Sequence, residues 1–269
     1  MKPLWKDIGL IGRDKLLEKE VIPLTLHPNK RFVLMGEAGI GKTAILECSA
    51  ENARRKSVLV NAMTQNLTML KQIAEAWGIA VESEGAKPKA SEYQAAILQS
   101  SGHALFIDDL HKASSAKLTL FRALAERHKV CGAMRSGLPK KDDLKQFLWG
   151  VRQITVDRLN NTDTERLTRE LILKEGSILD IMQVARVSGG VPGRIVAMVN
   201  SGQIQRHDSR LRSEEIDIGP WLIGLFGFMA IFRIMGRQMD ATDLTLLGGA
   251  IMLIVRLFIY PFVSKGKQK

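Results

Sequence analysis

The feature that most constrains this chain is a glycine-rich stretch that follows a short apolar run near the N-terminus. Residues 36–43 read Gly-Glu-Ala-Gly-Ile-Gly-Lys-Thr and fit the pattern G-x-x-x-x-G-K-[ST] at every fixed position. Apolar residues 32–35 precede the loop as an expected buried strand, and good helix formers follow it from Ala44. This order predicts a loop whose backbone N–H groups, together with a helix N-terminus, bind phosphate oxygens.

We expect this loop to bind ATP together with Mg²⁺. The Lys42 ammonium would reach the β- and γ-phosphates, and the Thr43 hydroxyl would be a ligand of Mg²⁺. The alternative is a chance glycine turn before a helix, which the correct flanking segments disfavour. The residues expected to contact the nucleotide are Gly36, Glu37, Ala38, Gly39, Ile40, Gly41, Lys42, Thr43 and Ala44.

Two adjacent carboxylates follow a second apolar run. Residues 104–107 are apolar throughout, as in a buried parallel strand, and Asp108 and Asp109 come directly after them. Because ligands bind beyond the carboxyl ends of such strands, we expect Asp108 to hold Mg²⁺ through its water shell. The alternative is that the two carboxylates cap the helix that follows.

Three more apolar runs, at 57–63, 130–134 and 153–156, predict further strands, and segments with helical spacing separate them. Strands that alternate with helices indicate an α/β fold with a parallel sheet. From Asp163 onward the pattern is helical, which predicts a small helical domain after the sheet.

The composition is that of a globular protein with a strong positive charge. Of 269 residues, 45% are hydrophobic and 25% are charged, and the formal net charge is +11. This excess could serve anionic lipid or nucleic acid, and the alternative is a solvated basic surface. Cys48 and Cys131 each lie inside an apolar run, which favours core positions in a reducing compartment. Residues 1–7 contain no apolar signal core, so we expect no signal peptide.

The last fifty residues change in character. Residues 218–235 and 244–263 are almost wholly apolar apart from Arg233 and Arg256, and a helix of about 20 such residues spans a bilayer. The alternative is a pair of buried helices, which would usually show a polar stripe. Basic residues flank the pair on both sides, so both ends are expected in the cytoplasm. We therefore expect a multi-pass protein of the inner (cytoplasmic) membrane, with its ATPase domain in the cytoplasm.

The combined pattern resembles the AAA+ ATPases. Within them it is most similar to the group that holds the origin-recognition initiators, the transposition regulators and the ExeA-type secretion ATPases. The resemblance covers about residues 8–200 and depends on five features. They are Ile-Gly-Arg-Asp at 11–14, the glycine loop, the helix–Gly78–loop–helix insertion, the polar strand end at Arg135 and Ser136, and Gly-Gly-Val-Pro-Gly-Arg at 189–194.

The resemblance implies roles for further residues. Arg135 or Ser136 would occupy the sensor 1 position, and Arg194 would occupy the sensor 2 position that touches the γ-phosphate. Asp109 stands where the family usually has a glutamate, so it would position the attacking water, and Lys42 would assist. Because aspartate is shorter by one methylene, we expect slow hydrolysis.

The resemblance also implies a homo-oligomer, because this class usually completes its site with an arginine from a neighbouring subunit. The possible donors are Arg122, Arg127, Arg152 and Arg158. The expected segments are a P-loop NTPase α/β domain (1–160), a helical lid (161–205), a basic linker (206–217), a transmembrane hairpin (218–263) and a basic tail (264–269). The hairpin stands where relatives carry a winged-helix DNA-binding domain.

The sequence leaves three functions open. The first is a membrane-anchored ATPase that drives assembly or remodelling of a membrane-associated protein partner of unknown identity. The second is an ATP-switched signalling or defence effector that acts through the hairpin, since Asp108 and Asp109 followed by Leu110 and His111 are also similar to STAND-class NTPases. The third is a membrane-tethered regulator that handles DNA, similar to transposition ATPases.

Overall fold

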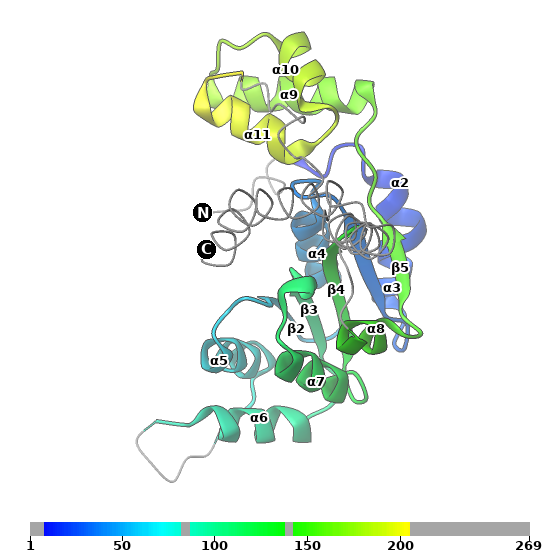
Figure 1. The fold of residues 1–269 in the computed structure, drawn as a ribbon, viewed down its shortest axis with the longest axis vertical. Coiled ribbons are helices and arrows are strands. Elements are labelled where there is room, and N and C mark those ends of the chain that lie inside the picture. Colours follow the sequence, from blue (N-terminus) through cyan, green and yellow to red (C-terminus); the bar gives the residue numbers. More distant parts are fainter. Residues whose placement is uncertain (1–7, 82–86, 138–141, 205–269) are drawn as a thin grey trace, which may run out of the picture. The chain divides into compact units, whose positions relative to one another are not determined.

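A computed structural model describes residues 8–81, 87–137 and 142–204 (Figure 1). Within these ranges, no helix has the length and apolar character needed to cross a membrane. The two apolar runs, the basic linker and the basic tail expected from the sequence lie outside the described residues, as do residues 1–7. The described residues belong to one compact unit.

A five-stranded parallel sheet forms the centre of the structure, which confirms the predicted α/β class (Figure 1). Its order in space is β2-β3-β4-β1-β5, and every neighbouring pair is parallel. The glycine loop leaves the carboxyl end of β1, so it opens between β4 and β5 at the edge where α/β proteins bind ligands. The strands are β1 (Phe32–Gly36), β2 (Ser57–Asn61), β3 (Ala104–Asp108), β4 (Lys129–Arg135) and β5 (Arg152–Thr155).

Helices pack on both faces of this sheet. One face carries α4 (Lys42–Glu51) and the N-terminal segment, made of α2 (Asp14–Leu16), η1 (Leu17–Val21) and α3 (Ile22–Leu26). The other face carries α5 (Asn66–Trp77), α6 (Ala90–Gln99), α7 (Ser115–Leu124) and α8 (Asp142–Leu148). A short 3₁₀ helix, η2 (Leu110–Lys112), follows β3.

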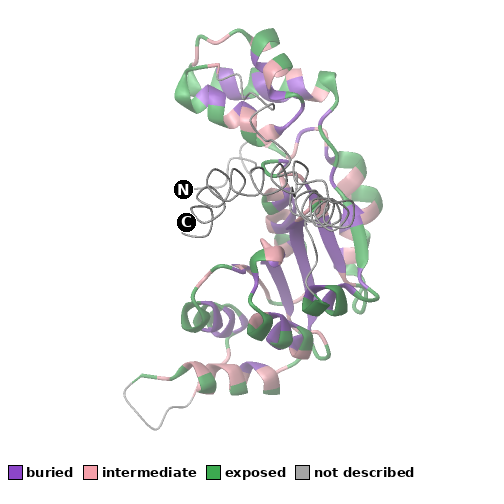
Figure 2. Ribbon diagram, viewed as in Figure 1, coloured by how far each residue is buried: buried purple, intermediate pink, exposed green. Residues whose placement is uncertain are grey.

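The strands β1, β3 and β4 are buried because helices cover them on both faces, whereas the edge strands β2 and β5 are more exposed (Figure 2). Alternate residues enter opposite cores, so that Phe32 and Leu34 belong to the core that includes residues of α4, whereas Val33 belongs to the core on the other face. Cys131 is fully buried, as expected, and burial raises the pKa of its thiol to about 11. Cys48 differs from the expectation, because it lies half-buried on the outer side of α4.

Three helices follow the sheet, in the segment expected to be a helical lid and called the lid below: α9 (Asn161–Glu175), α10 (Ile181–Ser188) and α11 (Pro192–Ser201). They share a separate apolar core, built around Leu171, Val184 and Ile195. Ile11 of the N-terminal segment also belongs to this core. The segment before α2 therefore packs against the lid, whereas α3 packs against the sheet.

An aromatic stack lies at the amino end of β3, opposite the glycine loop. The ring of Trp77 stacks on His128 at 4.5 Å and on His103 at 4.9 Å between centroids. Trp77 and His128 are buried. The backbone N–H of His103 donates a hydrogen bond to Nδ1 of His128 (3.3 Å).

Candidate nucleotide-binding site

The glycine loop has the backbone that its sequence predicts. Gly39 and Gly41 have φ angles of 77° and 101°, which side-chain-bearing residues rarely adopt. At Gly36 a Cβ would lie 2.9 Å from both the Ile40 side chain and the carbonyl oxygen of Val156. Helix α4 begins at Lys42, directly after the loop, so its unpaired N–H groups lie at the loop.

Lys42 points back across the loop rather than into solvent. Its Nζ donates to the carbonyl oxygens of Gly36 (3.0 Å) and Glu37 (2.7 Å), and the residue is buried. Burial lowers the pKa of this ammonium, and the carboxylates of Asp108 and Asp109 oppose that shift. The Lys42 side chain therefore lies at the position where the loop would receive phosphates.

Thr43 and Asp108 meet at the carboxyl edge of the sheet. The Thr43 hydroxyl donates to Oδ2 of Asp108 at 2.6 Å. Hydroxyl and carboxylate oxygens fit Mg²⁺, which usually binds one or two protein carboxylates together with substrate phosphates and water. Within the described ranges no group of three or more His, Cys, Asp or Glu side chains could hold a metal. The residues thus fit a magnesium ion that depends on its nucleotide.

Asp109 lies beside Asp108 in a constrained conformation. Its φ of 53° is left-handed, and among the described residues no other non-glycine has a positive φ. Its carboxylate pairs with Lys112 at 2.9 Å and takes a side-chain hydrogen bond from Asn61 at the end of β2. Partial burial raises the pKa of Asp109, but the bond and charge of Lys112, with His111 and Asn61, outweigh burial and lower it.

The structure brings both sensor 1 candidates to the loop. The Ser136 N–H donates to the carbonyl oxygen of Gly36 (3.2 Å), which fixes the end of β4 against the loop. The Arg135 N–H donates to Nδ1 of His111 (3.4 Å). Burial is the largest cause that lowers the pKa of Lys42, and the positive charge of Arg135 lowers it further.

The lid contacts the loop directly through two glycines. The N–H of Gly193 donates to the carbonyl oxygen of Gly39 (2.8 Å), and a Cβ on Gly193 would lie 2.8 Å from the Gly39 Cα. Arg194 follows on α11, and its Nη1 lies near Gly189, where an added Cβ would come within 3.9 Å. Arg194 therefore follows Gly193 in the chain, and its guanidinium lies beside Gly189, so its sensor 2 role stays a prediction.

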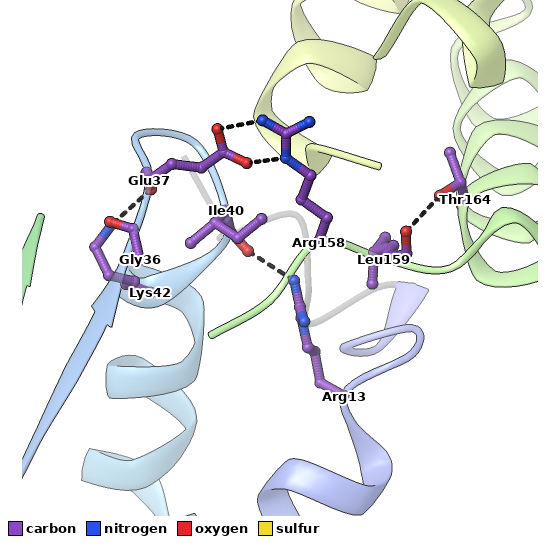
Figure 3. A network of polar contacts seen from close by, with 8 residues as sticks. All are labelled: Arg13, Gly36, Glu37, Ile40, Lys42, Arg158, Leu159 and Thr164. Carbon is purple, nitrogen blue, oxygen red and sulfur yellow. Dashed lines mark hydrogen bonds and ion pairs between the residues drawn. The ribbon is translucent and has the colours of Figure 1, made fainter. Parts of the chain in front are cut away.

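A cavity of about 360 Å³ opens beside the loop, large enough for part of a small ligand. Its lining is mainly apolar and comes from the N-terminal segment, the glycine loop with α4, and the lid. Ile11 and Arg13 of the segment at 11–14 thus border the cavity. Arg13 is buried beside the cavity, and its Nη2 donates to the carbonyl oxygen of Ile40 at 3.0 Å (Figure 3).

One contact at the site was not expected from the sequence. Arg158, considered above as a donor to a neighbouring subunit, contacts the loop of its own chain (Figure 3). Its Nε and Nη2 donate to the two carboxylate oxygens of Glu37 at 2.5 and 3.0 Å. The two residues are 121 positions apart in the sequence, so no local pattern could have predicted the pair.

Comparison with known proteins agrees with this geometry. Residues 27–140 match the family model described as an AAA domain. The chaperone proteins ClpB of Rickettsia conorii and Rickettsia bellii are 39% and 38% identical to this chain over 106 residues. The match covers 38% of this chain and 12% of each chaperone, so it spans a small part of the curated relatives' length.

Among solved structures, the RuvB Holliday junction branch migration motor of Thermotoga maritima superposes with a TM-score of 0.50. The sequences are 15% identical, and the alignment covers 94% of this chain and 78% of RuvB. At this identity the likeness concerns the fold alone. The described part of the chain therefore has an α/β fold like that of the RuvB motor, and residues 27–140 match the family model described as an AAA domain.

Proposed function

We propose that this protein is a membrane-anchored ATPase that binds and hydrolyses ATP to drive assembly or remodelling of a membrane-associated partner. The observation that carries the ATPase part is the contact between Thr43 and Asp108 beside the buried ammonium of Lys42. A cation for phosphates and two oxygens suited to Mg²⁺ lie together at the carboxyl edge of a parallel sheet. The AAA domain match supports nucleotide hydrolysis in general.

Each residue of the site would have its own role in hydrolysis. Loop N–H groups and Lys42 bind and orient the β- and γ-phosphates, and Thr43 and Asp108 would hold Mg²⁺, which withdraws charge from those phosphates. Asp109 would orient the attacking water. A base must approach within about 2.6–3.2 Å of the proton it takes, and this carboxylate is held by Lys112 and Asn61. Slow turnover is the expected consequence.

Substitution of Lys42 tests ATP binding. Lys42→Ala removes charge-assisted contacts worth roughly 1.5–3 kcal/mol each, so ATP affinity should fall at least about tenfold. A fluorescent ATP analogue titrated into the purified full chain measures this. Lys71→Ala, on the exposed surface of α5, is the matched control. Unchanged affinity in Lys42→Ala would refute ATP binding at this loop.

Membrane anchoring rests on the two apolar runs at 218–235 and 244–263, which lie outside the described residues. Their length, and the basic residues on both outer sides, support two spans with both ends in the cytoplasm. We accordingly propose the inner membrane as the location. Gln238→Cys should react with an impermeant thiol reagent from outside intact cells, and Ser264→Cys should react only after lysis. The reverse pattern would exclude this topology.

Oligomerisation would complete the site. Of the four candidate donors, Arg158 is engaged by Glu37 of its own chain, and Arg152 lies 3.7 Å from Glu20. Arg122 and Arg127 bond Gln146 and the carbonyl oxygen of Leu98 on the α7 side of the molecule. Sedimentation of the full chain in detergent, with and without a non-hydrolysable ATP analogue, tests assembly. A monomer at all concentrations would exclude the oligomer.

A second candidate function, handling of nucleic acid at the membrane, is favoured by the edge of the sheet opposite the loop. Basic residues directly precede β1 and β2, and others lie at or just before the start of β4 and β5. They gather there, since the amino ends of parallel strands share one edge: Lys30, Arg31, Arg54, Arg55, Lys56, Arg127 and Arg152. Trp149, 84% exposed, lies just before β5. Cationic grooves with exposed aromatic residues suit single-stranded nucleic acid.

Nucleic-acid binding is tested by fluorescence anisotropy of labelled single-stranded DNA with the full chain. Affinity should fall steeply as salt increases, because counterions are released on binding. Arg54→Gln combined with Arg55→Gln should weaken binding, whereas Arg169→Gln on the exposed surface of the lid should not. Absence of binding at low salt would remove this candidate.

A further inference from the structure

Glu37 is the one acidic residue of the glycine loop at 36–43. A carboxylate on a loop that receives a polyphosphate opposes binding, because like charges repel over the short distances within such a site. The same residue supports the loop through its backbone, since its carbonyl oxygen accepts a hydrogen bond from Nζ of Lys42 (2.7 Å). Glu37 therefore needs a partner that neutralises its charge and holds its backbone in place.

Arg158 is that partner in the structure. Its planar guanidinium binds Glu37 with two parallel bonds, Nε to Oε1 at 2.5 Å and Nη2 to Oε2 at 3.0 Å (Figure 3). This two-bond geometry fixes the direction of both side chains as well as their charges. Arg158 thus reaches Lys42 indirectly, through Glu37.

The position of Arg158 is itself fixed by the lid. It lies on the connector between β5 and α9, and the N–H of the next residue, Leu159, donates to the carbonyl oxygen of Gly190 (2.9 Å). Gly190 has a φ of 76°, and a Cβ there would lie 2.4 Å from the Leu159 carbonyl oxygen. The close approach of connector and lid therefore depends on this glycine. The packing of the connector backbone on Gly190 directs Arg158 toward the loop, although the Arg158 side chain is 56% exposed.

We propose that Arg158 is a positioning residue that acts in its own subunit and prepares the loop for the triphosphate by neutralising and orienting Glu37. This inference rests on the proposed binding of ATP. It gives Arg158 a role distinct from that of an arginine supplied to a neighbour, because the guanidinium is already engaged within the chain. It also predicts that the effect of Arg158 on binding passes through one named residue, Glu37.

A role of Arg158 in folding alone can be distinguished from a role in preparing the loop for ATP. Exposed ion pairs contribute little to folding, and the side chains of Arg158 and Glu37 are 56% and 29% exposed. Variants of either residue should therefore fold, and their thermal unfolding midpoints should match the parent. Any loss of nucleotide affinity in a variant with an unchanged midpoint would come from the site.

The test is a double-mutant cycle on ATP affinity, measured with a fluorescent ATP analogue on the purified full chain. Arg158→Gln leaves the Glu37 carboxylate uncompensated, and we expect about tenfold weaker binding at low salt. The loss should shrink as ionic strength rises. Arg158→Lys, which keeps the charge and loses the two-bond geometry, should bind with intermediate affinity. Arg169→Gln, an exposed arginine on α9, is the control and should bind like the parent.

The variant that carries both substitutions, at Glu37 and at Arg158, decides whether Arg158 acts through Glu37. Glu37→Gln removes the repulsive charge and should bind ATP about twofold more tightly than the parent. Glu37→Gln/Arg158→Gln should then bind within about twofold of Glu37→Gln, because Arg158 has no charge left to neutralise. A full loss that persists in the double variant would overturn the inference, as would unchanged affinity in Arg158→Gln.

Two further outcomes separate this inference from the proposed function. If the parent fails to bind ATP, both are wrong. If the parent binds and Arg158→Gln lowers turnover with unchanged affinity, ATP binding stands and the inference fails, because Arg158 would then serve a neighbouring site.

Discussion

The hydroxyl of Thr43 and the carboxylate of Asp108 lie 2.6 Å apart, although 65 residues separate them in the sequence. Thr43 is in the first turn of α4, and Asp108 is the last residue of β3. The contact depends on β4 lying between β1 and β3, because this order sets the loop and the carboxylate on the same edge. It is the relationship that most directly supports a magnesium–nucleotide site.

Substitution at this contact should change the requirement for magnesium. Asp108→Asn keeps the shape of the side chain and removes its charge, so the Mg²⁺ concentration needed for half-maximal ATP binding should rise about tenfold or more. A titration of Mg²⁺ at fixed ATP analogue measures this. Thr43→Ser should behave like the parent, whereas Thr43→Val should follow Asp108→Asn. Equal magnesium dependence in all variants would contradict the assignment.

Asp109 should affect turnover more than binding. Asp109→Asn removes the carboxylate proposed to orient water, so phosphate release should slow by about 10²-fold or more while ATP affinity stays within about twofold. Lys112→Ala offers a matched comparison, since it frees the same carboxylate from its ion pair. We expect Lys112→Ala to retain or increase turnover. Hydrolysis by Asp109→Asn at the parent rate would assign the water to another residue.

Arg194 should couple the lid to the γ-phosphate. If it touches that group, Arg194→Ala loses a charge-assisted contact to ATP that ADP cannot make, so the ratio of ATP to ADP affinity should narrow about tenfold. Competition of both nucleotides against one fluorescent analogue gives the ratio. Arg186→Ala, exposed on α10, is the control. A ratio equal to that of the parent would leave Arg194 as a lid-surface residue.

The sheet and the phosphate loop could be predicted from the sequence because their signals are local. A buried strand of apolar residues, a glycine loop and a helix follow one another within residues 32–51, and each shapes its own neighbourhood. The carboxylates at 108 and 109 were predictable because they end an apolar run. In the same way, the helical pattern after Asp163 predicted the helices that follow the sheet.

The contacts that tie these parts together could not be predicted. Arg158 and Glu37 meet only because β5 lies beside β1 and the connector to α9 packs on Gly190. Arg13 reaches Ile40 because Ile11 is buried in the lid core. Gly193 approaches Gly39 because both lack side chains. Such contacts depend on tertiary packing, which cannot be inferred from the periodicity or the composition of the sequence.

The aromatic stack at the opposite edge leads to a prediction on pH. His128 is buried, and its Nδ1 accepts a hydrogen bond from the His103 N–H, so protonation at this nitrogen would break that bond. Burial lowers the pKa of His128, and the neighbouring charge of His103 lowers it further, against the carbonyls of Ile97 and Ser100. The folded protein therefore binds a proton less readily than the unfolded chain.

This difference in proton binding makes the folded protein less stable as the pH falls. Below the unfolded histidine pKa of about 6.5 the unfolded chain takes up a proton first, so stability falls with decreasing pH until the folded pKa is reached. One histidine gives a slope of at most about 1.4 kcal/mol per pH unit. We expect the thermal unfolding midpoint of the parent to drop between pH 7.5 and 5 (about one unit above and one and a half units below that pKa). His128→Phe, which keeps an aromatic ring against Trp77, should start lower at pH 7.5 because the His103 N–H loses its acceptor, and then fall less steeply. His27→Gln, an exposed histidine at the same edge, should retain the parent slope. If His128→Phe and the parent lose stability in parallel, the acid sensitivity comes from other groups.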